Sequence, residues 1–519
     1  MTLQLGLDDA IAHTWIVGSN TAGKSNTLLY RLRMMAEDYQ GRRPCALVFI
    51  DPHGDAAMRL ARSLGSWDRL TILDPTYVSF GLNPLELPEG LGGEERAAAI
   101  QTQIGQLESI LWELFRDNLE TAPRMLTIFR TALYYLYETR DKPTFRDLFS
   151  LFLDMLQMDG EKLAAMLRLG DVRDGMIAST MEAISALEKD AFSPGINRIS
   201  SFVMPSDSIT SRTFGASASR LDFGRMLEPG MVTVFRLPKF QLPPDFTKLV
   251  TASVVIRLFL IVQKRARDLE RAGEAPEART PVILAVDEFQ NVAGLSVVET
   301  ILTEARKFGL YLWMAHQNLG QLDEQVLNAV MGNAGTIFSF RVGPDDAGKL
   351  AKVMYPQDER RLAEHLSSLP NHRVVVRRNP VAGSGPFRTF DIRYPRLPEP
   401  VHPEREVMEL MRGRMEGLYG GARPGEPAKA SREARERTTT TTAPPSSPLV
   451  DRRIIERILR HLVERGFTTR DEVARSCETN TRSVSRALAH LAANGLIERR
   501  DKGEIVVTEA GRRTARGSA

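Results

Sequence analysis

The chain contains, eighteen residues from its start, the stretch Gly18-Ser19-Asn20-Thr21-Ala22-Gly23-Lys24-Ser25, which has the spacing G-x4-G-K-S. Residues 13–17 before it have the composition of a short buried strand, and residues 26–32 after it have that of a helix. In this context the glycines let backbone N–H groups turn inward around phosphate oxygens at a helix N-terminus. The lysine contacts the outer phosphates, and the serine hydroxyl is placed to bind Mg2+. The predicted nucleotide-binding residues here are Gly18, Ser19, Asn20, Thr21, Ala22, Gly23, Lys24, Ser25 and Asn26.

A second motif completes this prediction. Residues 281–286 form a hydrophobic run that ends in Asp287 and Glu288, the Walker B pattern. We expect Asp287 to hold Mg2+ together with Ser25, and Glu288 to orient and deprotonate the attacking water. A carboxylate base favours sustained hydrolysis, and the N-K-x-D pattern of GTPases is absent, so the sequence favours ATP over GTP.

The composition is that of an ordinary water-soluble protein. The chain has 519 residues, 43% hydrophobic and 26% charged, which suggests about three domains. It contains neither an uncharged apolar run long enough to span a bilayer nor a signal peptide. The two cysteines, Cys45 and Cys477, are far apart and predict free thiols in a reducing cytoplasm. The scattered histidines predict no structural metal.

Seven apolar runs predict a doubly wound α/β domain with a parallel sheet. They are continuous rather than alternating, as in strands that are covered on both faces. The runs are residues 14–17, 46–50, 70–73, 231–235, 282–286, 310–315 and 336–340. Several end in polar residues at the edge where such sheets bind ligands: Asp51, Asp74, Asp287, His316, Gln317 and Arg341. For Asp74 we prefer the simpler interpretation that it marks a strand end.

Between residues 88 and 214 the strand pattern stops. Apolar residues spaced by three and four over 100–114 predict an amphipathic helix, and further helices are predicted over 122–138, 145–156 and 177–191. We therefore predict an all-α insertion at 88–214, within an α/β domain formed by residues 1–87 and 215–416. Residues 417–448 lack apolar periodicity and predict a flexible linker.

Residues 449–519 predict a small basic domain. They contain fifteen Lys and Arg against ten Asp and Glu, a net charge of +5 that suggests a polyanionic partner. Three helical patterns and a hairpin resemble a winged-helix domain, whose third helix lies in a DNA major groove. Its predicted DNA-binding residues are Arg482, Ser483 and Arg486 on that helix and Arg499, Arg500 and Lys502 on the wing. The alternative is a winged helix that binds protein.

The motifs together resemble the HerA/FtsK superfamily, and most closely HerA-like and TraD/TraG-type conjugative DNA-transfer ATPases. The resemblance covers about residues 5–395. It rests on residues 6–13, the phosphate loop 18–25, residues 49–55, 81–86, 286–290, 304–310 and 315–317. It implies a RecA-like P-loop NTPase core with an all-α insertion, acting as a homohexameric ring that pumps DNA through its pore. The winged helix resembles the module with which FtsK recognises DNA sequence.

The resemblance also implies roles for individual residues. Arg306 resembles the arginine finger that a neighbouring protomer supplies to the γ-phosphate, with Arg341 as a weaker second candidate. Gln317 resembles the sensor that couples phosphate state to DNA binding, and Asp51 a residue near the nucleotide. Lys24, Glu288, Arg306 and Gln317 are thus the predicted catalytic residues, and ATP with Mg2+ the predicted cofactors.

The sequence also departs from the family. Only about a dozen residues precede the first strand, so the N-terminal β-barrel of many HerA proteins and the transmembrane helices of coupling proteins are not expected. We expect a cytoplasmic protein without direct membrane insertion, which a separate membrane-channel or nuclease partner completes. The expected function is ATP-driven DNA translocation in conjugative or mobile-element transfer. The alternatives are a HerA-type motor in DNA end processing, a nucleotide-gated DNA-binding regulator, and an ATPase that assembles a secretion machine without touching DNA.

Overall fold

The protein is described by a computed structural model. It covers residues 11–37, 44–114, 122–157, 172–187, 189–205, 208–379 and 387–419, and, in the C-terminal part, residues 458, 462, 467–468, 488, 491, 497–499 and 505–508. The chain divides into two compact units, Met1–Lys429 and Ala430–Ala519.

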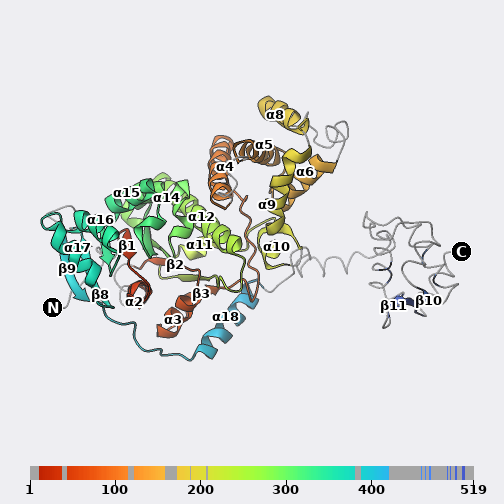
Figure 1. The fold of residues 1–519 in the computed structure, drawn as a ribbon. Helices are drawn as coiled ribbons and strands as arrows, with labels where there is room; N and C mark the ends of the chain where they lie inside the picture. The colour runs from red at the N-terminus through yellow and green to blue at the C-terminus, as the bar shows by residue number, and fades with distance from the viewer. Residues whose placement is uncertain are drawn as a thin grey trace. The chain divides into compact units, whose positions relative to one another are not determined.

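The first unit is built on a nine-stranded sheet (Figure 1). Seven parallel strands occupy the seven predicted positions: β1 (Thr14–Val17), β2 (Ala46–Asp51), β3 (Leu70–Leu73), β4 (Val232–Arg236), β5 (Val282–Val286), β6 (Leu310–His316) and β7 (Thr336–Ser339). The strand order is β3-β4-β2-β5-β6-β1-β7-β8-β9. All residues of β2 and β5 are buried, as expected for strands that are covered on both faces. The predicted α/β fold is confirmed.

The sheet is mixed rather than wholly parallel. Strands β8 (Arg373–Arg378) and β9 (Arg388–Arg393) add an antiparallel hairpin beside β7, which the sequence did not predict. The buried apolar centre of β8 is only Val374–Val376, with arginines beyond it, and β9 is largely solvent-facing. Edge strands with so few buried positions give little hydrophobic signal, which is why the pattern missed them.

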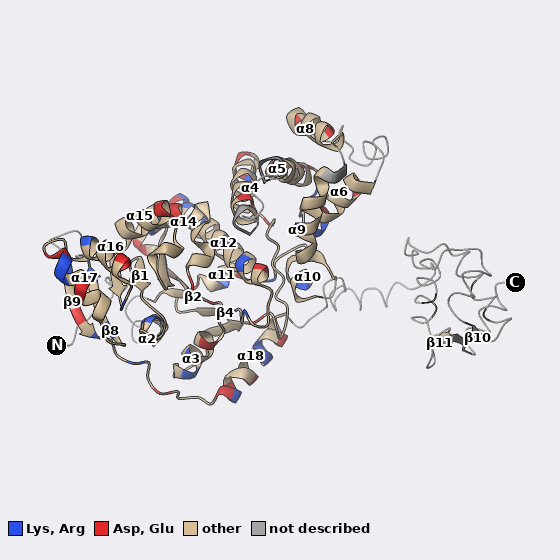
Figure 2. Ribbon diagram, in the orientation of Figure 1, with Lys and Arg blue, Asp and Glu red and all other residues tan. Residues whose placement is uncertain are grey.

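Helices cover both faces of the sheet. Figure 1 shows α12, α14 and α15 on one side and α2, α3 and α18 on the other. The bounds are α2 (Lys24–Glu37), α3 (Asp55–Ser63), α12 (Pro244–Arg271), α13 (Gln290–Ala293), α14 (Ser296–Glu304), α15 (Glu324–Asn333), α16 (Pro344–Met354), α17 (Glu359–Ser368) and α18 (Glu404–Tyr419). Basic and acidic residues are interspersed along these helices (Figure 2). No helix in the described part of the chain is long and apolar enough to cross a membrane.

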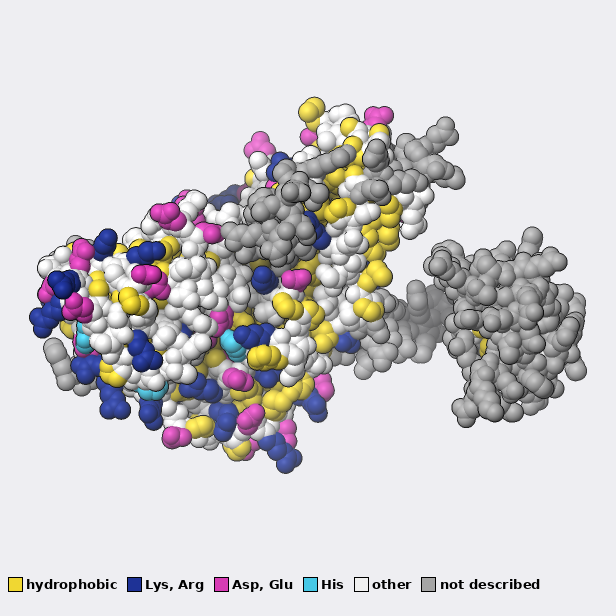
Figure 3. Space-filling model, in the orientation of Figure 1, with side chains coloured by type: hydrophobic (Ala, Val, Ile, Leu, Met, Phe, Trp, Pro, Cys, Tyr) yellow, Lys and Arg dark blue, Asp and Glu magenta, His cyan; other side chains and the backbone are white. Residues whose placement is uncertain are grey.

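Between β3 and β4, helices are the regular structure of the described residues. They are α4 (Gly93–Leu114), α5 (Ala122–Thr139), α6 (Phe145–Gln157), α8 (Gly175–Ser185), α9 (Ser193–Val203), α10 (Ile209–Phe214) and α11 (Phe223–Met226). The helix predicted over 177–191 ends at Ser185, and a new helix starts at Ser193 because Pro194 suits the first turn of a helix. Edge-to-face pairs such as Phe129–Phe152 fill the core of this region. Figure 3 shows hydrophobic side chains along its α6–α9 side.

Asn83 joins the sheet to these helices. Its buried amide nitrogen donates to the carbonyl oxygens of Pro143, at 2.9 Å, and Ser217, at 3.2 Å. Its amide oxygen accepts from the N–H of Leu85 at 3.0 Å. One side chain therefore holds its own turn through Leu85 and bonds to two backbone groups from distant parts of the chain, which explains why an asparagine stands in the motif at 81–86.

We expect Asn83→Ala to destabilise the first unit by about 3 kcal/mol, because buried backbone groups that lose their hydrogen-bond partners keep their full desolvation cost. The midpoint of urea unfolding, followed by circular dichroism, measures the change. The matched control is Asn333→Ala, since the amide of Asn333 bonds only to the carbonyl oxygen of Ala329 on the exposed side of its own helix. Equal midpoints for the two variants would contradict the role given to Asn83.

In the second unit the described elements are three short strands, β10 (Phe467–Thr468), β11 (Ile497–Arg499) and β12 (Ile505–Val507). Strand β12 pairs antiparallel with β11, at the place of the predicted wing, and with β10, which was not predicted. Ile458, Leu462, Leu488 and Leu491 are buried. The predicted DNA contacts Arg482, Ser483, Arg486, Arg500 and Lys502 lie outside the described residues, as do residues 420–448 of the predicted linker; of Arg499 the backbone alone is described.

Candidate functional site

The predicted phosphate loop connects β1 to α2. The N–H of Ser19 donates to the carbonyl oxygen of Arg341, and the ammonium group of Lys24 donates to the carbonyl oxygen of Ser19 at 3.1 Å. A Cβ atom on Gly18 would lie 2.5 Å from the Cβ of Phe340, so a larger residue there would collide with the strand beside it. Gly23 has a φ of 124°. Both glycines are therefore required by the local backbone.

The loop opens onto a cavity of about 800 Å³ at the carboxyl ends of the strands. Its walls contain, from the predicted site, Asn20, Thr21, Gly23, Lys24, Ser25, Asn26, Asp287, Glu288 and Gln317. Gly18, Ser19 and Ala22 form the loop behind this wall. The structure thus brings together residues that lie almost 300 positions apart in the sequence.

Ser25 and Asp287 form the predicted metal pair. The Ser25 hydroxyl donates to Asp287 Oδ2 at 3.1 Å. Burial, together with the nearby Asp51 and Glu288 carboxylates, raises the pKa of Asp287 to about 6. A buried carboxylate among like charges next to a hydroxyl suits a hard divalent cation such as Mg2+, which takes oxygen ligands and needs few protein groups. The described residues contain no group of three or more acidic, histidine or cysteine side chains that could hold a metal alone.

The carboxylate of Glu288 is fixed by three side chains. Oε1 contacts His53 Nε2 at 3.1 Å and Gln317 Nε2 at 3.4 Å, while Oε2 accepts a short hydrogen bond from Gln290. The bond to His53 is the largest cause that lowers the pKa of Glu288, to about 2. Glu288 is therefore ionised at neutral pH, as a proton acceptor must be.

Strained backbone gathers at this cavity. Three non-glycine residues of the described chain have positive φ values: Thr21 at 63°, Glu288 at 55° and His372 at 65°. All three line the cavity. Such conformations cost about 1–3 kcal/mol each and concentrate at functional sites. The strain is independent support for a functional role of the cavity.

Asp51 is placed differently from its prediction. It is fully buried behind the cavity wall rather than in it. Its carboxylate accepts from the N–H groups of His53, at 3.0 Å, and Ala57, at 2.7 Å. Burial raises the pKa of Asp51, opposed by these backbone hydrogen bonds. Its structural role is to hold the turn that carries His53.

Strand β6 carries two predicted residues at its opposite ends. Gln317 follows its carboxyl end and lines the cavity. His316 next to it is buried and accepts from Trp15 Nε1 at 2.6 Å, and burial lowers its pKa to about 4, so it stays neutral. Arg306 lies before the amino end, in the 3-10 helix η5 (Ala305–Phe308), where its side chain is exposed. This places it at the amino ends of the strands, whereas the cavity lies at their carboxyl ends, and its charge contributes to the lowered pKa of His13, which precedes β1.

Arg341, the second candidate for the finger, follows β7 and meets the phosphate loop through its backbone carbonyl. Its side chain is outside the cavity lining. Neither arginine therefore reaches the nucleotide cavity of its own chain.

The sequence did not single out six further residues of the cavity wall: His53, Arg59, Lys239, His372, Arg396 and Leu397. His53 lies in the motif at 49–55 without a role assigned to it, and its place just after β2, at a strand end, could have suggested one. Residues 395–397 gave no signal, because they reach the site through tertiary contacts. The amide of Asn26 donates to the carbonyl oxygen of Pro395 at 2.8 Å and accepts from the N–H of Leu397 at 2.9 Å.

Comparison with known proteins identifies one part of this site. Residues 281–354 match the family model described as the TraM recognition site of TraD and TraG. This segment runs from β5 to α16 and includes Asp287, Glu288, Arg306 and Gln317. A search of curated proteins found no match.

Several solved structures resemble the chain. The plasmid coupling protein TrwB in complex with a non-hydrolysable GTP analogue is 17% identical, over 76% of this chain and 88% of that one, with a TM-score of 0.49. TrwB with ADP and Mg2+ is 17% identical over the same shares, with a TM-score of 0.48. VirB4 of Thermoanaerobacter pseudethanolicus is 14% identical over 73% and 88%, also with a TM-score of 0.48. The resemblance to TraD/TraG-type proteins is confirmed by the family model for the segment from β5 to α16.

Proposed function

We propose that this protein is an ATP-driven DNA translocase of conjugative or mobile-element DNA transfer, which works as a homohexameric ring. The observation that carries the proposal is the convergence of Lys24, the Ser25–Asp287 pair and Glu288 on one cavity. These groups supply phosphate binding, a metal position and an ionised base, the parts that nucleotide hydrolysis needs.

The nucleotide in this proposal is ATP with Mg2+. Ser25 and Asp287 would hold the ion, which would neutralise charge on the transferred phosphoryl group. Glu288 would take the proton of the attacking water, and Lys24 would contact the outer phosphates. Solved structures of TrwB hold an ATP analogue, a GTP analogue, or ADP with Mg2+.

The proposed role in conjugation rests on the family match over residues 281–354. In TraD and TraG, this family is the recognition site for TraM. We propose by analogy that this chain also binds a protein that marks the DNA to be transferred. The match favours this role over the alternatives of DNA end processing and gene regulation.

In the proposed ring each nucleotide lies between two protomers. Arg306 is exposed at the amino ends of the strands, opposite its own cavity, a position suited to reach the cavity of a neighbour. The basic residues 449–519 would recruit DNA, and a separate membrane-channel protein would bring the cytoplasmic ring to the membrane.

The test is ATP and GTP hydrolysis by the full chain, measured by phosphate release with and without single- or double-stranded DNA. We expect ATP hydrolysis that DNA stimulates severalfold, and hexamers in native mass spectrometry with nucleotide and DNA. A streptavidin-displacement assay on end-labelled DNA then measures translocation directly. Hydrolysis by a monomer that DNA leaves unchanged would contradict the proposal and favour the regulator.

A further inference from the structure

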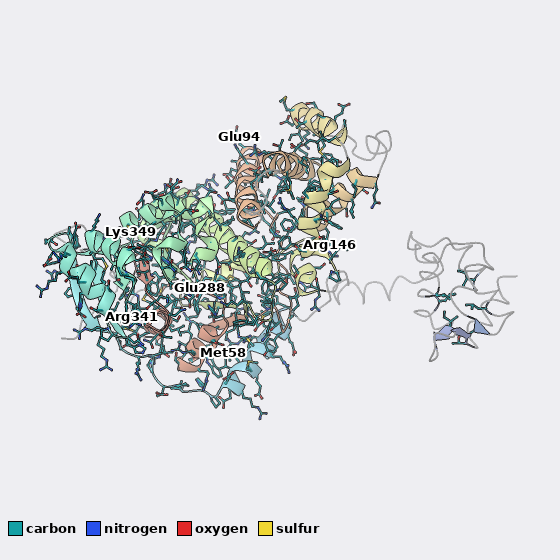
Figure 4. All side chains as sticks on the ribbon, in the orientation of Figure 1. Met58, Glu94, Arg146, Glu288, Arg341 and Lys349 are labelled. Atoms are coloured by element: carbon teal, nitrogen blue, oxygen red, sulfur yellow. The ribbon has the colours of Figure 1, made fainter. Side chains whose placement is uncertain are left out.

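Two residues to which the sequence analysis gave no role, a histidine and a lysine, lie beside the base of the proposed ATPase. His53 Nε2 is 3.1 Å from Glu288 Oε1, and the ammonium nitrogen of Lys239 is 3.4 Å from the same His53 nitrogen. Both side chains line the nucleotide cavity. Figure 4 labels Glu288 within the body of the sheet domain.

The two contacts of His53 exclude each other. A carboxylate only accepts hydrogen bonds, so Nε2 must carry a hydrogen atom to bond with Glu288. An ammonium group only donates, so the same Nε2 must lack a hydrogen atom to bond with Lys239. If His53 is fully protonated, Lys239 becomes a repelling neighbour. His53 Nε2 can therefore bond to Glu288 or to Lys239, but not to both at once.

The backbone holds this pair of residues together. The N–H of Lys239 donates to the carbonyl oxygen of Pro52 at 3.0 Å, and the N–H of Leu237 donates to that of Asp51 at 2.9 Å. The buried Asp51 carboxylate bonds to the N–H of His53. The turn after β2 and the turn after β4 are thus joined. The backbones of His53 and Lys239 are held in place, while the imidazole and the ammonium group can still change hydrogen-bond partners.

A second layer supports the turn after β2. Arg236, at the end of β4, donates through Nε to the carbonyl oxygen of Gly54 at 3.1 Å and forms a short ion pair with the fully buried Asp74. A Cβ atom on Gly54 would lie 3.2 Å from Pro238 and 3.3 Å from Arg236 Nε. The ion pair with Arg236 gives Asp74 a structural role, whereas from the sequence we interpreted it only as the mark of a strand end.

We propose that Lys239 contacts the outermost phosphate of the bound nucleotide and that His53 is a positioning residue for Glu288, so that the two side chains link phosphate binding to the orientation of the base. The proposal rests on the ATPase function proposed above. A phosphate in the cavity competes with His53 for the ammonium group of Lys239. Once Lys239 turns to the phosphate, His53 Nε2 is left to donate to Glu288, which is then held with Gln317 and Gln290 in one orientation.

The experiment separates kcat from affinity. His53→Ala should lower kcat about tenfold or more, part of the usual contribution of a general base, while binding of a non-hydrolysable ATP analogue changes less than about twofold. His53→Gln, whose amide can donate a similar hydrogen bond, should recover most of kcat. Lys239→Met should weaken the ATP analogue about tenfold, the value of one charge-assisted hydrogen bond, and leave ADP binding unchanged.

Two control variants change the same residue types, a histidine and a lysine, outside the cavity. His365 contacts Asp391 at 2.7 Å as another histidine–carboxylate pair, so His365→Gln should match the wild type. Lys349 is an exposed lysine on α16, labelled in Figure 4, and Lys349→Met should also match it. In the double variant of His53→Ala and Lys239→Met, kcat should fall no further than in His53→Ala alone, because Lys239 affects Glu288 only through His53.

The possible failures are distinct. A wild-type protein that binds nucleotide without hydrolysing it would overturn the proposed function and this inference with it. A wild type that hydrolyses ATP, with His53→Ala and His53→Gln both at wild-type kcat, would overturn the role of His53 alone. Equal weakening of ADP and the ATP analogue by Lys239→Met would overturn the contact with the outermost phosphate.

Discussion

Glu288→Gln should lower ATP hydrolysis by about 10²–10⁴-fold, the usual contribution of a general base, while leaving nucleotide bound. The substitution keeps the volume of the side chain but removes the proton acceptor that His53, Gln317 and Gln290 orient. The phosphate loop and the Ser25–Asp287 pair are untouched, so affinity for ATP should change by less than about threefold. The variant should therefore accumulate protein with intact ATP.

Single-turnover phosphate release and equilibrium binding of a fluorescent ATP analogue measure the two quantities separately. The matched control is Glu364→Gln, because Glu364 pairs with Arg360 on the exposed face of α17. Retention of more than about a tenth of wild-type hydrolysis by Glu288→Gln would show that another group accepts the proton.

Arg306→Ala should lower hydrolysis by about 10³–10⁵-fold, as arginine fingers do elsewhere, if the residue stabilises the transferred phosphoryl group of a neighbour. Its own cavity is complete without it, so ATP binding should remain. The physical reason for expecting action between protomers is its exposed position at the amino end of β6, whereas the cavity lies at the carboxyl ends of the strands.

Mixing the two inactive variants tests this directly. A cavity from an Arg306→Ala protomer and a finger from a Glu288→Gln protomer form a complete site, so random equal mixing should restore about one quarter of the sites in a ring of identical heterologous interfaces. Arg360→Ala serves as the control for loss of an exposed arginine. Absence of recovery in mixtures that native mass spectrometry shows to be hexameric would refute the shared site.

The sequence predicted the parallel part of the fold well because buried strands have a strong signal. Residues 282–286 are apolar without interruption, and the structure buries each of them. The hairpin β8–β9 escaped prediction because its burial is confined to a few residues, and the boundary at Ser185 because helical periodicity continues past the point where the backbone turns. Local sequence patterns fail to predict the elements and boundaries that tertiary contacts determine.

The residues of the candidate site that belong to a recognisable sequence motif could be predicted. Lys24, Ser25, Asp287 and Glu288 belong to such motifs and lie together as expected. Asp51 shows the limit of the approach, since a carboxylate at a strand end can support a turn from behind as well as face a ligand. Lys239 and the residues around Arg396 carry no motif, because their approach to the loop is set by contacts between chain segments that are distant in sequence.

Strand β6 has a consequence for how sites in the proposed ring would communicate. It is seven residues long, about 20 Å, and it lies between the strands that carry the phosphate loop and Glu288. One end leads to Gln317, which lines the cavity of its own chain, and the other leads to Arg306, which would enter the site next door. A buried strand that is hydrogen-bonded on both sides is stiff, so β6 would move as a rigid element. A shift of the protein around one nucleotide would therefore be passed to the next site without bending within the domain.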